Sequence, residues 1–289
     1  MYRRDGYRIK PVEPMYTIAP YIMDKRYDAS NSVTEEIDYE IIRDYTRECR
    51  HKGIAMSHMA VIIAAYLRVV SQNPYLNRFV VNKRIYSRNH FCVTFVTLKK
   101  DDSTTIKVYF NLDDDIFTVN DKINHAVENV KEKGESTSMD WIAGLLLKIP
   151  GLLSLGVSVL KFIDKHFWLP FILCDASPFH TSLFITNLAS IRTEAIYHHI
   201  YEFGTTSIFC AMGLPKDKVI KNHSGEFDEH KFMELGIVTD ERIADGHYFG
   251  RCFREFNRYL KNPSLLEKKP VSVVKDTDIK SNNPKFIVK

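Results

Sequence analysis

The chain has 289 residues, of which 45% are hydrophobic, and this is enough to bury a sizeable core, so disorder as the main state is excluded. The 40 Lys and Arg residues are nearly balanced by 36 Asp and Glu residues, and the formal net charge is only +4. Such a balance excludes the strong positive field of a nucleic-acid-binding protein, and no nucleic-acid partner is expected.

The first half of the chain begins with residues 1–33, an arm rich in Pro, Tyr and Arg. Helical spacing after Thr34 predicts a helix over residues 34–47. Residues 59–70 are apolar on nearly every side, which predicts a helix buried in the core that stops at Asn73 and Pro74. Runs of β-branched and aromatic residues then predict strands at 84–88, 91–98 and 105–110, the last two joined as an antiparallel hairpin by a turn at 101–103.

The second half continues with a predicted helix over 117–133 and an apolar segment over 141–174. Strands are predicted at 182–186, 207–212 and 231–239, followed by a helix over 247–260 whose apolar residues recur at three- and four-residue steps. The polar tail, residues 267–289, is expected to lie on the surface or to dock on a neighbour. The order of elements is mixed α+β, and it predicts an arm (1–33), one domain (34–266) and a tail (267–289).

The apolar segment at 141–174 is the one candidate for contact with a membrane. Charged residues interrupt it, and its longest uncharged run, residues 149–160, is shorter than the roughly 20 residues that a spanning helix needs. Buried or interface helices are therefore predicted there, and membrane contact is not expected.

Metal sites and disulfides are not predicted either. The cysteines are odd in number, far apart and without CxxC spacing: Cys49, Cys92, Cys174, Cys210 and Cys252. The acidic run 113–115 is typical of a solvated turn. The charged N-terminus lacks the apolar stretch of a secretion signal, so a protein of the reducing cytoplasm is expected.

Four segments, in the same order, carry a resemblance to a known family. They are residues 18–26 (IAPYIMDKR), the apolar helix 60–77 ending in NPYLN, residues 181–191 (TSLFITNLASI) and residues 240–266, which begin with DERIADG and end in NPSLL. Over about residues 15–266 the chain resembles the catalytic domain of dihydrolipoyl acyltransferases, the transferase subunits of 2-oxo acid dehydrogenase complexes, and through them chloramphenicol acetyltransferase.

This resemblance implies a chloramphenicol acetyltransferase-like fold, a two-layer α+β structure with a mixed sheet and flanking helices. It also implies a homotrimer with active sites at the subunit interfaces, where coenzyme A enters from one side and the acyl acceptor from the other. Neither a lipoyl domain nor a peripheral-subunit-binding domain precedes the core, so no lipoyl group is expected on this chain, nor membership in an ordinary dehydrogenase complex.

The family motif HRxxDG is present with one change, because Glu241 stands at the His position while Arg242, Asp245 and Gly246 match. In the family the His is the base, a hydroxyl of the adjacent subunit stabilises the oxyanion, and the Asp holds an Arg. By position Glu241 would be the base and Thr186, followed by Asn187, the oxyanion hydroxyl. Asp245 would be the structural carboxylate, paired with Arg26 or Arg242, a choice that the sequence leaves open.

A glutamate in place of the histidine changes the chemistry of the site. A weaker base alone costs about tenfold in rate, but an ionised carboxylate also repels the developing oxyanion unless burial raises its pKa. His198 and His199 follow the Thr186 strand and are candidates to replace the missing base, the alternative being a structural pair. His247 is assigned to packing at the start of a helix, and Cys210 has no base beside it.

Three functions remain open at this point. The first is transfer of an acyl group from acyl-CoA to an unidentified acceptor. The second is a pseudoenzyme, a trimeric binding or scaffolding module that uses residues 141–174 to contact a partner or a membrane surface. The third is hydrolysis of a thioester with Glu241 as base.

Overall fold

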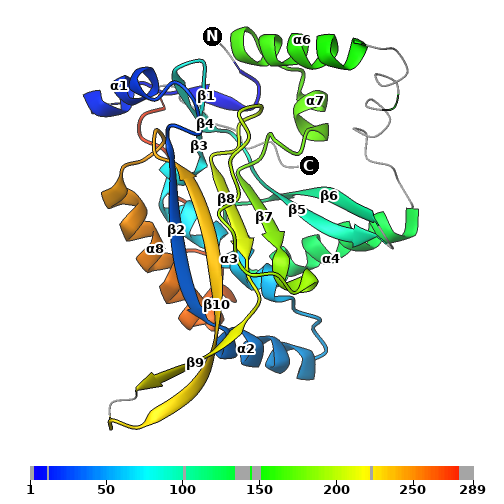
Figure 1. Ribbon diagram of the computed structural model, residues 1–289, viewed down its shortest axis with the longest axis vertical. Helices are drawn as coiled ribbons and strands as arrows, with labels where there is room; N and C mark the ends of the chain where they lie inside the picture. Colours follow the sequence, from blue (N-terminus) through cyan, green and yellow to red (C-terminus); the bar gives the residue numbers. More distant parts are fainter. Residues whose placement is uncertain are drawn as a thin grey trace.

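The centre of the computed structural model is a mixed sheet in the order β2-β10-β8-β7-β5-β6, with β9 paired to β10 (Figure 1). The structure describes residues 3–11, 13–99, 102–133, 144, 151–221 and 224–279. The strands are β2 Ser30–Asp38, β5 Phe91–Lys99, β6 Asp102–Phe110, β7 Leu183–Asn187, β8 Ile208–Met212, β9 Lys216–Lys221 and β10 Phe227–Asp240. β7 is parallel to β5 and β8, and the other pairs are antiparallel, so the predicted mixed α+β fold is confirmed.

Helices α2 Tyr39–His51, α3 His58–Gln72, α4 Ile116–Lys133 and α8 Gly246–Lys261 cover one face of this sheet (Figure 1). α3 lies in the middle and contacts both α4 and α8. It is apolar around its circumference, and its side chains from Ala60 to Ala65 are all buried, as expected of a helix with neighbours on every side. The main core lies between these helices and the sheet.

The opposite face of the sheet carries a smaller apolar cluster formed by Phe184, Ile200, Phe209 and Val238. The chain between β7 and β8 crosses this face. A Cβ atom on Gly236 would lie 2.3 Å from the carbonyl oxygen of Ile196, so the crossing chain rests directly on the sheet where a side chain is missing. We call residues 192–201 the crossing segment.

A second, three-stranded antiparallel sheet has the order β1-β4-β3, with β1 Gly6–Arg8, β3 Arg78–Val81 and β4 Arg84–Arg88. Asn82 and Lys83 join β3 to β4 with φ angles of 48° and 60°, the left-handed backbone of a type I′ hairpin turn. The carboxylates of Asp276 and Asp278 bind the buried guanidinium of Arg78 at 2.6 and 2.8 Å. This part of the tail therefore docks on its own chain.

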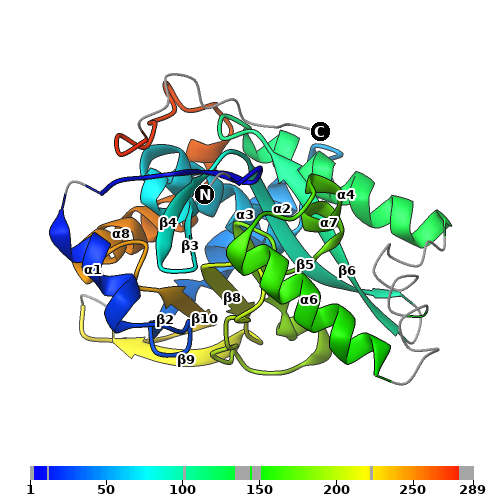
Figure 2. The same cartoon turned by 90° about the horizontal axis from the view of Figure 1, so that it is seen from above.

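Helices α1 Pro14–Ile22 and α6 Leu152–His166 lie at one end of the molecule, at the top of Figure 1 and facing the viewer in Figure 2. α7 Phe171–Ala176 connects α6 to the sheet. Most of α6 is exposed, but Asp164 near its C-terminus is buried. Its carboxylate binds Arg3 at 2.8 Å and His180 at 3.3 Å, which fixes that end of the helix.

Several predicted elements are confirmed within one or two residues, namely α3, β4, β5, α4 and α8. The β5–β6 hairpin and β10 are also confirmed, but β6 begins three residues and β10 four residues earlier than predicted. The predicted helix over 34–47 is wrong in its first part. Residues 34–38 belong to β2, and α2 begins only at Tyr39, where the side chain of Asp38 caps it by accepting the Glu40 N–H. Pairing with β10 decides the structure here, because Glu35 and Glu36 have no strong strand preference of their own.

Two further predictions involve residues that the structure describes only in part. The turn predicted at 101–103 begins outside the described residues, while Asp102 and Ser103 already belong to β6. Of the apolar segment 141–174, residues 141–143 and 145–150 also lie outside them. Within the described part of the chain, no helix combines the length and the apolar character needed to cross a bilayer. All five cysteines are buried as free thiols.

Candidate active site

The motif residues form the turn between β10 and α8. The backbone N–H of Glu241 donates to the carbonyl of Ala29 at 2.9 Å, and that of Asp240 donates to Ser207 at 2.9 Å. Ile243 and Ala244 are completely buried, so they anchor the turn to the core. The turn is therefore held on both sides by backbone and apolar contacts.

The buried carboxylate in this turn is Asp240, one residue before the motif. Its two oxygens accept hydrogen bonds from Nε and Nη2 of Arg242 at 2.8 and 2.7 Å, and Nε of Arg26 lies 3.9 Å away. Burial opposes the charge of Arg242, but its hydrogen bonds with Asp240 raise its pKa above the usual value. Burial lowers the pKa of Arg26, which four backbone carbonyls also hold.

Asp245 has a different role from the one expected. It is exposed and caps α8, accepting the Tyr248 N–H at 2.7 Å and the Tyr16 hydroxyl at 3.0 Å. The Tyr248 N–H lowers the pKa of Asp245 below its usual range. The expected ion pair between Asp245 and Arg26 or Arg242 is wrong, because both guanidinium groups lie against Asp240. The buried Asp240 was missed because it stands one residue before the motif, and sequence spacing does not distinguish it from Asp245 as a partner of the arginines.

Glu241 itself is half-buried at the end of β10. Its Oε2 accepts a hydrogen bond from Asn31 Nδ2 at 2.5 Å. Among the residues that the structure describes, no Lys, Arg or His forms an ion pair with it. The carboxylate is therefore partly exposed and oriented by one neutral amide.

Thr186 lies in β7, two strands away from Glu241. Thr186 pairs with Ala211 of β8, and Ile208 of β8 pairs with Thr239 of β10. Glu241 is two residues beyond Thr239, so it is at the level of position 206, five positions from Ala211. At about 3.3 Å per residue, Thr186 and Glu241 are roughly 16 Å apart along the strands. One chain does not bring these two residues together.

The crossing segment places His198 and His199 on the same face of the sheet as Thr186. His198 stacks on Phe209, with ring centroids 4.1 Å apart, and Phe209 stacks on Phe184. Thr186 follows Phe184 by two positions and so points to the same face. His198 is half-buried, and its Nδ1 lies 2.8 Å from the carbonyl oxygen of His199. His198 therefore packs against the sheet, and His199 is exposed.

Gly246 and Asn187, two further positions taken from the family resemblance, have unusual surroundings. A Cβ atom on Gly246 would have no atom within 4 Å, so no described residue requires a glycine there. Asn187 follows Thr186, and its side-chain oxygen is buried with no hydrogen-bond partner among the described residues. Gly246 is exposed, and the Asn187 oxygen is left without a partner in the described part of the chain.

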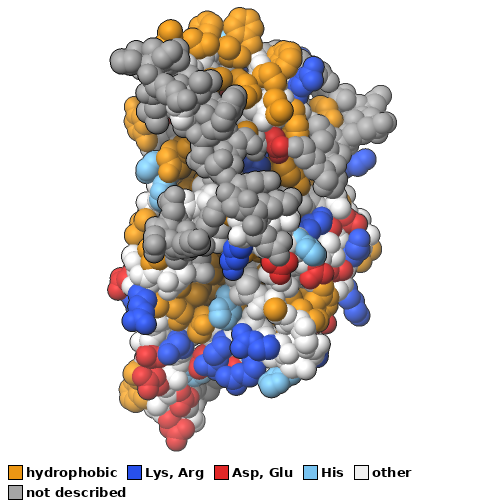
Figure 3. All heavy atoms as spheres, turned by 90° about the vertical axis from the view of Figure 1, so that its right-hand side faces the viewer, with side chains coloured by type: hydrophobic (Ala, Val, Ile, Leu, Met, Phe, Trp, Pro, Cys, Tyr) orange, Lys and Arg blue, Asp and Glu red, His pale blue; other side chains and the backbone are white. Residues whose placement is uncertain are grey.

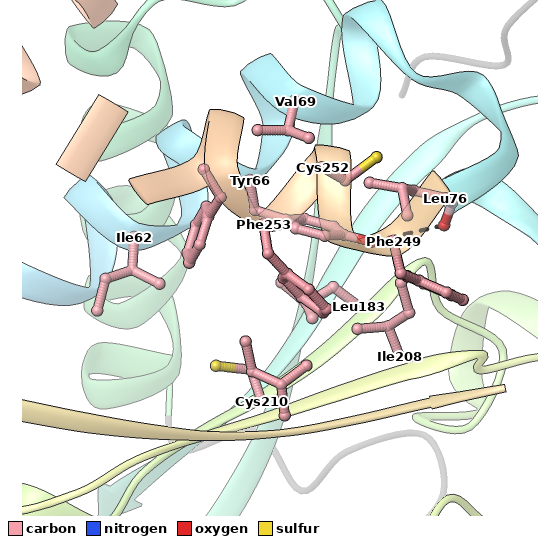
Figure 4. Close-up of a pocket in the computed structure, with 12 residues that line it drawn as sticks. Ile62, Tyr66, Val69, Leu76, Leu183, Ile208, Cys210, Phe249, Cys252 and Phe253 are labelled. Carbon is pink, nitrogen blue, oxygen red and sulfur yellow. Dashed lines mark hydrogen bonds between the residues drawn. The ribbon is translucent and has the colours of Figure 1, made fainter. Parts of the chain in front are cut away.

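A cavity of about 30 Å³ lies between α3, α8 and the sheet (Figure 4). Only apolar parts of its lining residues face it, among them Tyr66, Leu183, Cys210 and Phe253. The cavity is small and its lining is apolar, so it is a packing void in the core. In the described part of the chain, no group of three or more His, Cys, Asp or Glu residues is arranged to hold a metal ion.

No model of a known protein family matches the sequence, and no curated protein matches it either. Solved structures do match the fold. A probable dihydrolipoamide acetyltransferase from Listeria monocytogenes gives a TM-score of 0.58 at 10% identity, covering 92% of this chain and 97% of that chain. Chloramphenicol acetyltransferase gives a TM-score of 0.51 at 12% identity, covering 83% of this chain and 92% of that chain.

A third similar structure is the dihydrolipoamide acetyltransferase of Azotobacter vinelandii, studied for the role of a serine, a histidine and an asparagine in its catalytic mechanism. It gives a TM-score of 0.56 at 10% identity, covering 89% of this chain and 92% of that chain. These comparisons confirm the resemblance stated from the four sequence segments. At such low identity they show the fold and leave the reaction open.

Proposed function

We propose that this chain is a CoA-dependent acyltransferase-like protein that acts as a cytoplasmic homotrimer and transfers an acyl group from acyl-CoA to an acceptor. Its active site would lie between two copies, where Glu241 of one copy meets Thr186 of the next. The observation that carries this proposal is the separation of roughly 16 Å between the two residues along the strands of one chain. Glu241 and Thr186 can serve one reaction only if two copies supply them.

The reaction would use groups that this chain provides. Glu241 accepts the proton of the acceptor as the acceptor attacks the thioester carbonyl, and the Thr186 hydroxyl donates a hydrogen bond to the resulting oxyanion. Collapse of this intermediate breaks the carbon–sulfur bond, and the departing thiolate of coenzyme A takes the proton from Glu241. No metal is needed for these steps.

The similar structures support the same assignment. The Azotobacter enzyme was studied through a histidine and an asparagine four residues apart, which is also the spacing of Glu241 and Asp245. In this proposal Glu241 takes the place of that histidine, and Asp245 positions the motif by capping α8. His198 and His199 lie on the Thr186 face, where they would line the site of the neighbouring copy.

The test is release of free thiol from acetyl-CoA and longer acyl-CoAs, with and without a panel of acceptors. We expect the parent protein to be active and both Glu241→Ala and Thr186→Ala to be inactive. A mixture of the two inactive variants, dissociated and reassembled together, should regain part of the activity, because some interfaces then contain both intact residues. If mixing restores nothing while each variant still assembles, the shared site is wrong.

One observation favours a second candidate, a pseudoenzyme that acts as a trimeric scaffold. Among the described residues, Glu241 has a neutral amide beside it and forms no ion pair, so its carboxylate would repel a developing oxyanion. In this case the parent protein shows no acyl transfer, and Glu241→His acquires this activity. Thiol release that needs no acceptor would instead identify thioester hydrolysis as the reaction.

A further inference from the structure

Helix α6 presents an apolar stripe to solvent. Leu155, Val159 and Phe162 follow one another at steps of four and three residues, so they share one side of the helix. The exposed fractions of Leu155 and Phe162 are 63% and 57%. Figure 3 shows hydrophobic side chains gathered at the top of the molecule, where Figure 1 places α6. A stripe of this kind normally packs against something.

Helix α1 has the same property at the same end of the molecule (Figure 2). Met15, Ile18 and Ile22 are spaced three and four residues apart and are exposed, Ile22 at 71%. Tyr21 is also exposed, and the ammonium of Lys83 lies 5.3 Å from the centre of its ring. We call these two helical stripes and the residues between them the α1–α6 face.

A basic pocket of about 290 Å³ lies between the two helices. Its walls come from the chain after α1, the β3–β4 turn, the C-terminal part of α6 and residues 202–204. Its charged lining residues are Lys25, Arg26, Lys83, Lys161, Lys165 and Arg242, against Asp24, Asp164 and Glu202. Six positive charges against three negative ones leave a net +3 among the lining residues, and the buried carboxylate of Asp240, which lies against Arg26 and Arg242, reduces this to +2.

Three of these positive charges, on Lys25, Lys161 and Lys165, form no ion pair among the described residues. The others are paired, Lys83 with Asp24 at 3.5 Å, and Arg26 and Arg242 with the buried Asp240. The acidic lining residues, in contrast, are engaged: Asp164 binds Arg3, and Glu202 accepts the Arg26 N–H. The pocket is therefore complementary to an anion.

We propose that the α1–α6 face binds the surface of a membrane that contains anionic phospholipid. A headgroup phosphate would occupy the basic pocket, and the stripes of α1 and α6 would lie among the upper parts of the acyl chains. Helices that lie in the plane of a membrane surface combine an apolar stripe with flanking basic residues in this way, and their binding depends on anionic lipid. Lys161 and Lys165, four residues apart, supply the basic side of α6.

An aromatic residue just after α6 supports a membrane surface, rather than an anion dissolved in water, as the binding partner of this face. Trp168 is exposed, and the guanidinium of Arg4 lies 4.6 Å from its ring centre. Tryptophan beside a basic residue is typical of the boundary between lipid headgroups and acyl chains. This proposal goes beyond acyl transfer and is independent of it, and it revises the expectation from sequence that residues 141–174 would not contact a membrane.

The test is co-sedimentation of the full-length protein with vesicles of phosphatidylcholine, with and without about one-third phosphatidylglycerol. We expect binding to the anionic vesicles only, weakening as salt is raised. Lys161→Glu combined with Lys165→Glu should weaken this binding at least tenfold, and Leu155→Ser combined with Phe162→Ser should abolish it. Lys52→Glu combined with Lys261→Glu makes the same change of charge at exposed sites beyond this face and should bind as the parent does.

Several results would overturn the proposal. These are absence of vesicle binding, equal binding to neutral vesicles, or an equal loss in the control variant. If the parent protein does not bind vesicles and the Leu155→Ser and Phe162→Ser variant forms a smaller oligomer than the parent, a second copy covers this face. Tight binding of inorganic phosphate or acyl-CoA without any vesicle binding would show that the pocket takes a free ligand. Circular dichroism of each variant separates these results from failure to fold.

Discussion

Arg242 binds the carboxylate of Asp240, two residues earlier in the chain, with hydrogen bonds of 2.8 and 2.7 Å to its two oxygens. Arg26 approaches one of the same oxygens. A single buried carboxylate therefore stands between two buried guanidinium groups, directly beside the residue that we assign as the base. The stability of the site depends on this carboxylate.

Asp240→Asn should lower the free energy of unfolding by about 3–5 kcal/mol, because it leaves two buried positive charges without a counter-charge. Urea denaturation measures this change. Asp217→Asn is the matched control, since it removes the partner of an exposed Lys231 ion pair and should cost less than about 1 kcal/mol. Similar losses in both variants would show that Asp240 does not have this structural role.

Asp245 should act as a helix cap and not as the partner of an arginine. Asp245→Ala is expected to cost about 1 kcal/mol, because the Tyr248 N–H loses its acceptor, whereas Asp245→Asn should cost only a few tenths. Thermal denaturation of the two variants distinguishes the roles. An ion pair would instead make the asparagine variant as unstable as the alanine variant.

Gly246→Ala should leave stability unchanged or raise it by up to about 1 kcal/mol, because the added methyl meets no atom of the chain and the residue lies in a helix. We nevertheless expect it to lower acyl transfer, since the open space belongs to the proposed interfacial site. The measurement pairs a melting curve with the thiol-release assay. Full activity in a stable variant would place the substrate elsewhere.

Gly236→Ala should destabilise the protein by about 1–3 kcal/mol, because its methyl group would collide with the carbonyl of Ile196 and lift the crossing segment off the sheet. Gly250→Ala is the control, since it lies in α8 and meets only the end of the Arg254 side chain at 3.8 Å; it should gain up to about 1 kcal/mol. If Gly236→Ala is as stable as the control, the crossing segment is not pressed against the sheet.

Acid should release the C-terminal part of α6. Burial lowers the pKa of His180. Burial alone would raise the pKa of Asp164, but the contacts of Asp164 with His180 and Arg3 lower it below its usual value. Both groups therefore stabilise the fold at a pH above their pKa values in the unfolded chain, which are near 6.5 and 3.9. This stability is lost as the pH falls through their lower pKa values in the folded protein. Limited proteolysis of α6 should therefore increase from below about pH 6.5 and again below about pH 4. In Asp164→Asn the cleavage should be higher at every pH and the step below about pH 4 should disappear, while the step due to the buried His180 remains.

Elements with strong periodicity could be predicted from the sequence. The apolar run of α3, the β5–β6 hairpin and the Phe249–Phe253–Phe256 pattern of α8 each carry a local signal that tertiary structure did not override. β2 has no such signal, since its residues are strand-forming only because β10 pairs with them. The position of the motif turn could be predicted from the sequence. The carboxylate that binds Arg242 and Arg26 could not, because sequence spacing does not distinguish Asp240 from Asp245.

The solvent exposure of apolar side chains also could not be predicted from the sequence. The apolar residues of α6 are typical of a buried helix, and only the structure shows that Leu155 and Phe162 face solvent. In the same way, the basic pocket joins residues from five separate segments, none of which is unusual in charge by itself. Such a site arises from the fold and has no local pattern to identify it.

The register of β2 with β10, in which Ser30 pairs with Asp240, joins residues at opposite ends of the chain. During synthesis on the ribosome, β2 emerges about 200 residues before its partner and must wait with unpaired N–H and C=O groups along both of its edges. The central sheet closes only after nearly the whole chain has left the exit tunnel. Folding of this protein should therefore be slow and largely post-translational, and truncations that remove β10 should aggregate.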